Sequence, residues 1–105
     1  MAERYDLLVI GGGSGGLAHA QRAAEYGAKA AVVEYGPLGG TCVNVGCVPK
    51  KVMWYAAHLA HAVDDAPDFG VPARRDRTDW QKLVAARDHY IGNISQYWDA
   101  FVDDS

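Results

Sequence analysis

Two cysteines are the residues of this sequence best suited to covalent chemistry. Cys42 and Cys47 are separated by four residues, and Gly46 relaxes the backbone between them. At the predicted start of a helix, the helix dipole and the free amides stabilise thiolates and make them reactive. Metal binding would need further soft ligands, and the nearest histidine, His58, lies well beyond Cys47. The spacing therefore favours redox chemistry, with two buried and inert thiols as the alternative.

A glycine-rich turn is the second feature that could do chemistry. Gly11, Gly13 and Gly16 match the G-x-G-x-x-G pattern. In such a turn the glycines permit a tight bend, a close approach to a pyrophosphate and close packing of helix on strand. Glu34 follows at the end of the next predicted strand, where a carboxylate suits an adenosine ribose and disfavours a 2′-phosphate. The pattern predicts a dinucleotide site without separating FAD from NAD, and a turn without a ligand is the alternative.

The glycine turn lies inside a predicted βαβ unit that spans residues 1–34. Residues 5–10 and 28–34 each carry a run of apolar residues, which predicts two strands buried on both faces. Between them, residues 17–26 are good helix formers, and Gly27 supplies a C-terminal stop. The expected fold class is α/β, a partial Rossmann-like domain that is incomplete without later parts of the chain, because a doubly wound sheet needs more than two strands.

Residues 35–63 are predicted to form the loop and helix that carry the cysteines. The helix is expected to begin near Thr41 and to end near Val63. Pro49 should kink or restart it, because proline lacks the backbone donor and clashes with the preceding turn.

A polar connection over residues 64–77 leads to a last helix over residues 78–105, for which Thr78 is the expected N-cap. This helix has an apolar stripe at helical spacing. The stripe consists of Trp80, Leu83, Val84, Ile91, Ile94, Trp98 and Phe101. We expect it to find little to pack against in these 105 residues. The chain is therefore expected to be part of a longer polypeptide.

Composition limits the classes of partner. The formal net charge is −3, which gives no reason to expect a nucleic acid or an anionic membrane as a partner. The longest apolar runs are too short for a signal peptide or a membrane span, so a cytoplasmic protein is expected. The four histidines, His19, His58, His61 and His89, show no spacing that suggests a metal site. We therefore expect no metal.

Three segments resemble one family of redox enzymes. The run Gly39-Gly-Thr-Cys-Val-Asn-Val-Gly-Cys-Val-Pro-Lys-Lys-Val-Met-Trp54 is similar to the redox-disulfide signature of the flavoprotein disulfide reductases, class I of the pyridine nucleotide-disulfide oxidoreductases. Its second half resembles the glutathione-reducing branch in particular. The opening segment over residues 5–17 and the pairs at residues 79–80 and 87–88 resemble the same family. The resemblance covers nearly the whole chain without a gap.

The resemblance implies that the dinucleotide is FAD and assigns roles around it. The residues implied to hold the FAD pyrophosphate are Gly11, Gly13, Ser14 and Gly16, with Glu34 on the ribose and Thr41 as a further contact. Cys47 would lie next to the flavin, accept its electrons and form a charge-transfer complex as a thiolate. Cys42 would be the interchange thiol that attacks the substrate disulfide. Lys50 would lie near flavin N5.

The resemblance also implies parts that lie outside this sequence. NADPH would bind to a further domain, the enzyme would be a homodimer, and the acid/base histidine would come from the partner subunit. The implied reaction is the NADPH-dependent reduction of glutathione disulfide, and the 105 residues alone are expected to be inactive.

The substrate contacts implied by the resemblance are Ser14, Gln21, Tyr90 and Trp98. At position 21 the glutathione-reducing branch has an arginine, and at position 98 a tyrosine, so Gln21 and Trp98 depart from the pattern. Trp98 has an alternative interpretation as a core aromatic residue. These departures keep trypanothione and thioredoxin open as substrates. Lys50 disfavours two further alternatives, mercuric ion and a lipoyl group, because the enzymes that act on them usually have a serine at this position. A nucleotide-binding module without turnover is the alternative from another class.

Overall fold

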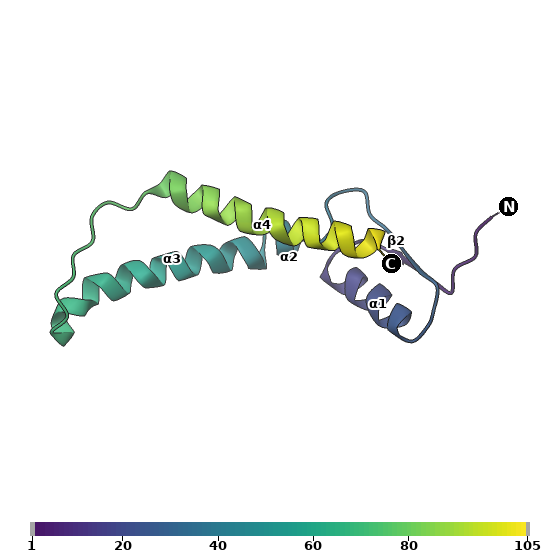
Figure 1. Ribbon diagram of the computed structural model, residues 1–105, viewed down its shortest axis with the longest axis horizontal. Helices are drawn as coiled ribbons and strands as arrows, with labels where there is room; N and C mark the ends of the chain where they lie inside the picture. The colour runs from purple at the N-terminus through teal and green to yellow at the C-terminus, as the bar shows by residue number, and fades with distance from the viewer. Residues whose placement is uncertain (1, 105) are drawn as a thin grey trace.

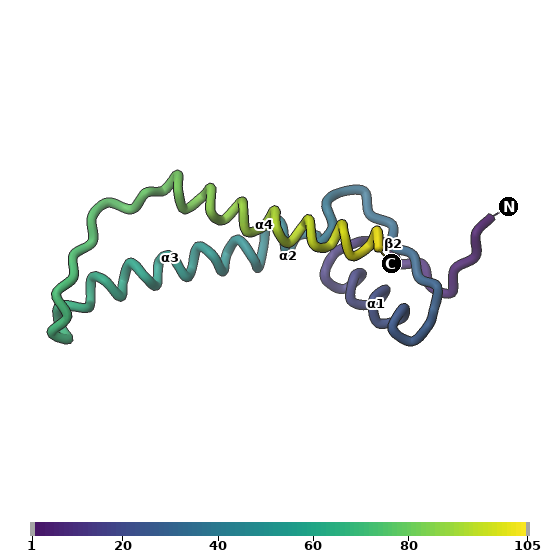
Figure 2. Tube along the Cα trace, in the orientation of Figure 1, coloured from purple at the N-terminus to yellow at the C-terminus, as the bar shows by residue number. Residues whose placement is uncertain are grey.

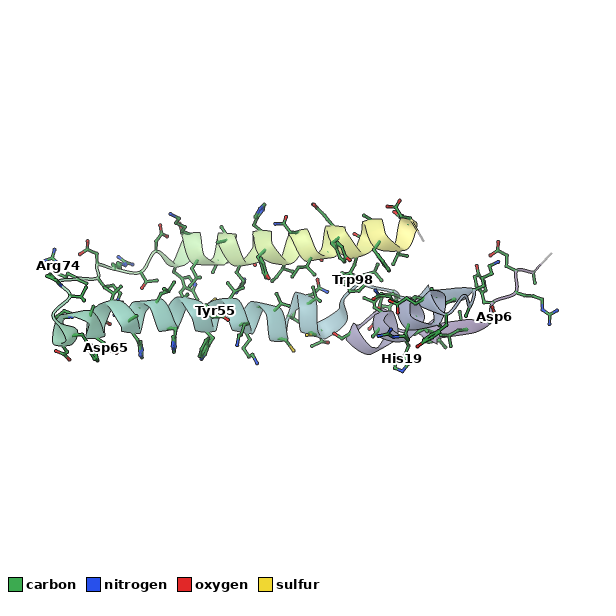
Figure 3. All side chains as sticks on the ribbon, turned by 60° about the horizontal axis from the view of Figure 1, so that its bottom comes forward. Asp6, His19, Tyr55, Asp65, Arg74 and Trp98 are labelled. Atoms are coloured by element: carbon green, nitrogen blue, oxygen red, sulfur yellow. The ribbon has the colours of Figure 1, made fainter. Side chains whose placement is uncertain are left out.

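The computed structural model describes residues 2–104, and they form an elongated molecule. Its principal extents are 70 × 26 × 19 Å and its radius of gyration is 20.0 Å. A compact domain of this length has a radius of gyration of about 13 Å. A small α/β unit occupies one end, and a long helical hairpin extends from it (Figures 1 and 2). Asp6 lies near one end of the molecule, and Asp65 and Arg74 lie at the other (Figure 3).

The α/β unit is the predicted βαβ motif. Strand β1 (Leu7–Ile10) pairs in parallel with β2 (Ala30–Val33), and helix α1 (Ser14–Glu25) connects them. The pairing aligns Leu7 with Ala30 and Ile10 with Val33. Helix α1 packs on both strands and buries Leu17 and Ala20. The α/β fold class is therefore confirmed, although both strands are shorter than predicted and α1 begins three residues earlier.

The prediction that both strands are buried on both faces is wrong for the described residues. Side chains alternate along β1, and those of Leu8 and Ile10 are 58% and 86% exposed. Alternate residues of a strand point to opposite faces, and α1 is the one helix of this unit that covers the sheet. The run of apolar residues in β1 is therefore typical of a strand in a sheet that is covered on both faces, whereas here α1 covers one face.

The predicted helix from Thr41 to Val63 is two helices, α2 (Gly40–Asn44) and α3 (Cys47–Asp65). The break lies at Val45 and Gly46, so the prediction that Pro49 interrupts the helix is wrong. Pro49 lies in the first turn of α3, where a backbone N–H has no intrahelical acceptor and its absence costs nothing.

The hairpin continues through a short 3₁₀ helix, η1 (Ala66–Phe69), and an extended connection to α4 (Trp80–Asp103). The N-cap of α4 is Asp79 and not the predicted Thr78, because an Asp79 oxygen accepts the amide of Lys82 at 3.0 Å. Arg75 fastens the connection to α3 through two-pronged hydrogen bonds to Asp64, the shortest at 2.7 Å. The guanidinium of Arg75 lowers the pKa of the Asp64 carboxyl.

The apolar stripe of α4 has more to pack against than expected, since α4 contacts both α3 and α2. Its residues from Leu83 to Phe101 are nevertheless half-buried, and Trp80 is exposed. Among the described residues, the buried apolar side chains are Leu17, Ala20 and Val43. The core therefore lies where α1 and α2 meet, and the hairpin has none of its own. Within residues 2–104, no helix has both the length and the apolar character to cross a membrane.

Packing of α1 on β1 predicts a sharp difference between two neighbouring glycines. A Cβ at Gly16 would lie 1.8 Å from the Gly11 carbonyl oxygen, whereas a Cβ at Gly15 meets nothing within 4 Å. We expect Gly16→Ala to lower the free energy of unfolding by more than about 2 kcal/mol. Gly15→Ala should be neutral or stabilising by up to about 1 kcal/mol, because alanine favours a helix over glycine. Urea unfolding followed by circular dichroism measures both, and equal stabilities would contradict the close approach.

Candidate active site at three helix N-termini

The site forms where the N-termini of α1, α2 and α3 come together. The segments that follow β1 and β2 touch through their backbones, because Gly13 bridges to Gly39 and the Gly39 amide donates to the Gly12 carbonyl at 2.8 Å. Helix α1 then contacts α2, which leads into α3. Both the glycine turn and the cysteine pair predicted from the sequence therefore lie in one place.

The glycine turn has the form of an anion cradle. The Gly11 amide donates to the Val33 carbonyl at 2.7 Å, and the chain then turns into α1 with Gly13 as its N-cap. No side chain caps this end, and the first turn of α1 contains no acidic residue. Free amides and a positive dipole end suit a phosphate or pyrophosphate. The geometry at Gly11, Gly13, Ser14 and Gly16 thus fits the pyrophosphate of FAD, and their contact with it stays a prediction.

Glu34 is occupied by backbone amides at the end of β2. One carboxylate oxygen accepts the Gly12 amide at 2.7 Å, and the other accepts the amides of Tyr35 and Gly36 at 2.8 and 3.0 Å. The hydrogen bonds from Gly36 and then Gly12 lower the pKa of the Glu34 carboxyl. Glu34 therefore holds the glycine turn, a role that sequence reasoning missed. A carboxylate has lone pairs left for a ribose hydroxyl, so its ribose contact stays a prediction.

Cys42 and Cys47 are close enough to interact through their sulfur atoms. Cys42 lies within α2 and is half-buried, and Cys47 is the exposed first residue of α3. The side chain of Cys47, the hydroxyl of Ser14 and the backbone of Cys47 all act on the Cys42 thiol and lower its pKa. Both cysteines are free thiols in the structure. The predicted redox pair is thus brought together, and its oxidation to a disulfide stays a prediction.

The surroundings favour a thiolate at Cys42. The hydrogen bond with Cys47, followed by that with Ser14, lowers the pKa of the Cys42 thiol, and the charge of Lys50 adds to this effect. The same pairing raises the pKa of the Cys47 thiol. A thiolate at Cys42 suits the predicted interchange thiol, which attacks a disulfide. The predicted thiolate at Cys47 concerns its complex with a flavin and stays a prediction.

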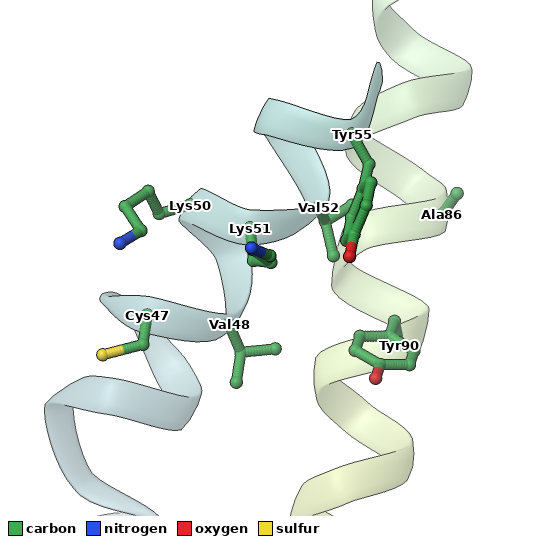
Figure 4. Close-up of a pocket in the computed structure, with 8 residues that line it drawn as sticks. All are labelled: Cys47, Val48, Lys50, Lys51, Val52, Tyr55, Ala86 and Tyr90. Atoms are coloured by element: carbon green, nitrogen blue, oxygen red, sulfur yellow. The ribbon is translucent and has the colours of Figure 1, made fainter. Parts of the chain in front are cut away.

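A groove of about 640 Å³ opens between α3 and α4 beside Cys47. Its lining includes Cys47, Val48, Lys50, Lys51, Val52, Tyr55, Ala86 and Tyr90. Val48 and Tyr90 lie between the two helices, whereas the side chains of Cys47 and Lys50 extend to the other side of α3, away from α4 (Figure 4). Cys47 therefore stands at the boundary of two surfaces, with the predicted substrate residue Tyr90 on one and the predicted flavin residue Lys50 on the other.

The other predicted contact residues are spread more widely. Gln21 is half-buried on α1, and Thr41 is exposed on α2. Trp98 is half-buried and stacks edge-on with Tyr97 and Phe101, at ring separations of 5.6 and 5.7 Å. Gln21 and Trp98 are not among the residues that line the groove. Both ring partners of Trp98 belong to α4 itself, so its substrate contact and its alternative interpretation as a core aromatic residue both stay predictions.

Two of the four histidines have local partners. The His19 ring nitrogen Nδ1 lies 2.6 Å from the Gly15 carbonyl oxygen, and the His58 ring stacks on Trp54 at 4.5 Å. Within residues 2–104, no group of three or more histidine, cysteine, aspartate or glutamate side chains could hold a metal ion.

Known proteins are similar to this chain over most of its length. The profile of the family described as pyridine nucleotide-disulphide oxidoreductase matches residues 5–100. The glutathione reductase of Yarrowia lipolytica is 54% identical over 95 residues, which cover 87% of this chain and 20% of the relative. That of Debaryomyces hansenii is 48% identical over 99 residues (88% and 20%), and that of Schizosaccharomyces pombe is 50% identical over 101 residues (94% and 22%). The chain thus spans about a fifth of the length of these relatives.

The contact between Ser14 and Cys42 predicts how the reactivity of Cys42 depends on pH. A hydroxyl that donates to the sulfur stabilises the thiolate, so Ser14→Ala should raise the pKa of Cys42. We expect the rate of Cys42 alkylation by iodoacetamide at pH 7 to fall roughly two- to tenfold, and its onset to shift to higher pH. Ser14→Thr keeps the hydroxyl and is the matched control. Identical pH profiles for Ser14→Ala and the unmodified protein would rule out the contact.

Proposed function

The chain belongs to the pyridine nucleotide-disulphide oxidoreductase family, and from this premise we propose that it is the amino-terminal FAD-binding and redox-disulfide segment of an NADPH-dependent glutathione-disulfide reductase. One observation carries the proposal. The Cys42 and Cys47 sulfurs meet at the N-terminus of α3, directly beside the glycine turn at the start of α1. A dithiol next to an anion cradle is what electron transfer between a bound dinucleotide and a disulfide requires.

FAD, when bound, would supply two electrons received from NADPH, which a part of the protein outside this chain would bind. We assign the backbone of the glycine turn at Gly11, Gly13, Ser14 and Gly16 to its pyrophosphate. Glu34 and Thr41 are the proposed contacts to the rest of the cofactor. Lys50 extends to the same side of α3 as Cys47, which supports its proposed position at the flavin edge (Figure 4).

The thiol chemistry follows from the proposed thiolate at Cys42. Its sulfur attacks one sulfur of the substrate disulfide, forms a mixed disulfide and releases the first thiolate, which takes up a proton. The Cys47 thiol then loses its proton, and its sulfur attacks the Cys42 sulfur. This step releases the second substrate thiolate and leaves a Cys42–Cys47 disulfide. Two electrons and two protons restore the dithiol, so each cycle reduces one disulfide to two thiols.

The groove beside Cys47 is the proposed place for the substrate. It offers the cation of Lys51, which suits a carboxylate of glutathione, and the hydroxyls of Tyr55 and Tyr90. Ser14, Gln21 and Trp98 are proposed as further contacts. Gln21 and Trp98 differ from the arginine and tyrosine of the glutathione-reducing branch, which supports a second candidate function in the same family with trypanothione, thioredoxin or mercuric ion as substrate. A module without turnover is the further alternative.

The complete protein is proposed to be a homodimer. Large apolar side chains on α3 and α4 support this, since Trp54, Leu59 and Trp80 are 49%, 69% and 58% exposed. We also propose that it works in the cytoplasm, where the surroundings keep thiols reduced.

Substitution of the interchange thiol tests the proposed reaction. In the complete, FAD-loaded protein, Cys42→Ser should lower NADPH-dependent reduction of glutathione disulfide at least about a thousandfold, because the nucleophile is gone. The flavin absorbance should remain, because Cys42 does not bind the cofactor. Asn93→Ser, at an exposed position on α4, is the control. Unchanged turnover in Cys42→Ser would overturn the proposal, and initial rates with a panel of disulfides would identify the substrate.

A further inference from the structure

The side chain of Asn44, which lies between the two cysteines in the sequence, makes three hydrogen bonds. Its amide nitrogen donates to the carbonyl oxygens of Leu38 and Gly40, at 3.2 and 2.9 Å. Its amide oxygen accepts the hydroxyl of Ser95 at 3.4 Å. The side chain is half-buried, so water competes only partly for these bonds.

These bonds matter because α2 cannot hold itself in place. It has five residues and no side-chain N-cap, and a helix of this length is unstable alone. Asn44 is the last residue of α2, and the carbonyls of Leu38 and Gly40 that it binds come before Cys42 in the chain. The carboxamide therefore closes the turn that carries Cys42 and fixes its orientation.

The bond to Ser95 connects the turn with the far end of the chain. Ser95 belongs to α4, which contacts α2 and also carries Tyr90 of the groove. Helix α4 is thus hydrogen-bonded to the residue that orders α2. At 3.4 Å this bond is longer than the two bonds to the carbonyls, and its contribution is the smaller.

We propose that Asn44 is a positioning residue for the cysteine pair, which holds α2 against the preceding loop and against α4 so that the Cys42 and Cys47 sulfurs stay within bonding reach. The inference rests on the proposed function, in which these thiols cycle through a disulfide. A disulfide forms only within a narrow range of separations and angles. Loosening α2 lowers the effective concentration of one thiol at the other and so destabilises the disulfide.

The redox equilibrium of the pair measures this effect directly. The FAD-loaded protein is equilibrated without NADPH in mixtures of glutathione and glutathione disulfide. Two thiols of the protein form one disulfide, and one glutathione disulfide takes the two electrons and two protons and becomes two glutathione molecules. Trapping free thiols with a maleimide and weighing the Cys42–Cys47 peptide by mass spectrometry gives the ratio of dithiol to disulfide.

Asn44→Asp keeps the shape and the acceptor for Ser95 but removes both donors and faces two carbonyl oxygens with a charge. We expect its disulfide to be at least tenfold less stable, which makes the potential about 30 mV less negative. Ser95→Ala should act in the same direction by about twofold, since it removes only the weaker bond. Asn93→Ala changes an exposed amide on the same helix and should leave the ratio unchanged.

The outcomes separate the two ideas. If the unmodified protein forms no Cys42–Cys47 disulfide in any mixture, the proposed function falls and the inference falls with it. If the disulfide forms and Asn44→Asp has the potential of the unmodified protein, the inference alone is overturned. Circular dichroism checks that Asn44→Asp is folded. If it is not, Ser95→Ala decides, and a ratio identical to that of Asn93→Ala overturns the inference.

Discussion

The site depends on a backbone-to-backbone contact between the turns that follow β1 and β2. The Gly39 amide donates to the Gly12 carbonyl at 2.8 Å, and a Cβ at Gly40 would lie 2.8 Å from the Cα of Gly13. A side chain at Gly40 would therefore push the two turns apart. Because they touch, Ser14 at the start of α1 reaches the sulfur of Cys42 in α2. The dinucleotide turn and the thiol pair are therefore one structure and not two neighbouring motifs.

Electrostatics then favour negative charge at Glu34 and Cys42. No side chain caps the N-terminus of α1, α2 or α3, and the positive end of a helix dipole favours negative charge. Glu34 accepts three backbone amides from the turns after β1 and β2, and the backbone of Cys47 helps to lower the pKa of the Cys42 thiol. Carboxylate, thiolate and phosphate are stabilised for the same reason. Backbone amides and helix dipoles of this kind suit an anionic cofactor, and they also stabilise the thiolate form of a nucleophilic sulfur.

Local signals allowed much of the fold to be predicted from the sequence. The βαβ unit follows from two apolar runs, a helix-forming segment and the stop at Gly27, whose φ of 86° confirms its role. Cys42 and Cys47 could be paired from their spacing and their family resemblance. Two predictions about helix ends were wrong because neighbouring residues offered competing signals. Pro49 was expected to interrupt a helix but lies in the first turn of α3, and Asp79 caps α4 in place of its neighbour Thr78. Exposure of Leu8 and Ile10, and the roles of Ser14 and Asn44, depend on contacts between distant segments, which periodicity does not encode.

The break between α2 and α3 determines where the length of this chain is free to vary. One residue added or removed between Cys42 and Cys47 would change the separation and orientation of the two sulfurs, whereas the exposed Val45 tolerates a change of residue type. The connection between η1 and α4 is the opposite case. It has no regular structure and is fastened to α3 through Arg75, so extra residues on either side of Arg75 leave both helices where they are. Near the two sulfurs the chain therefore tolerates changes of residue type but not of length. At the far end of the hairpin, between η1 and α4, it also tolerates inserted residues.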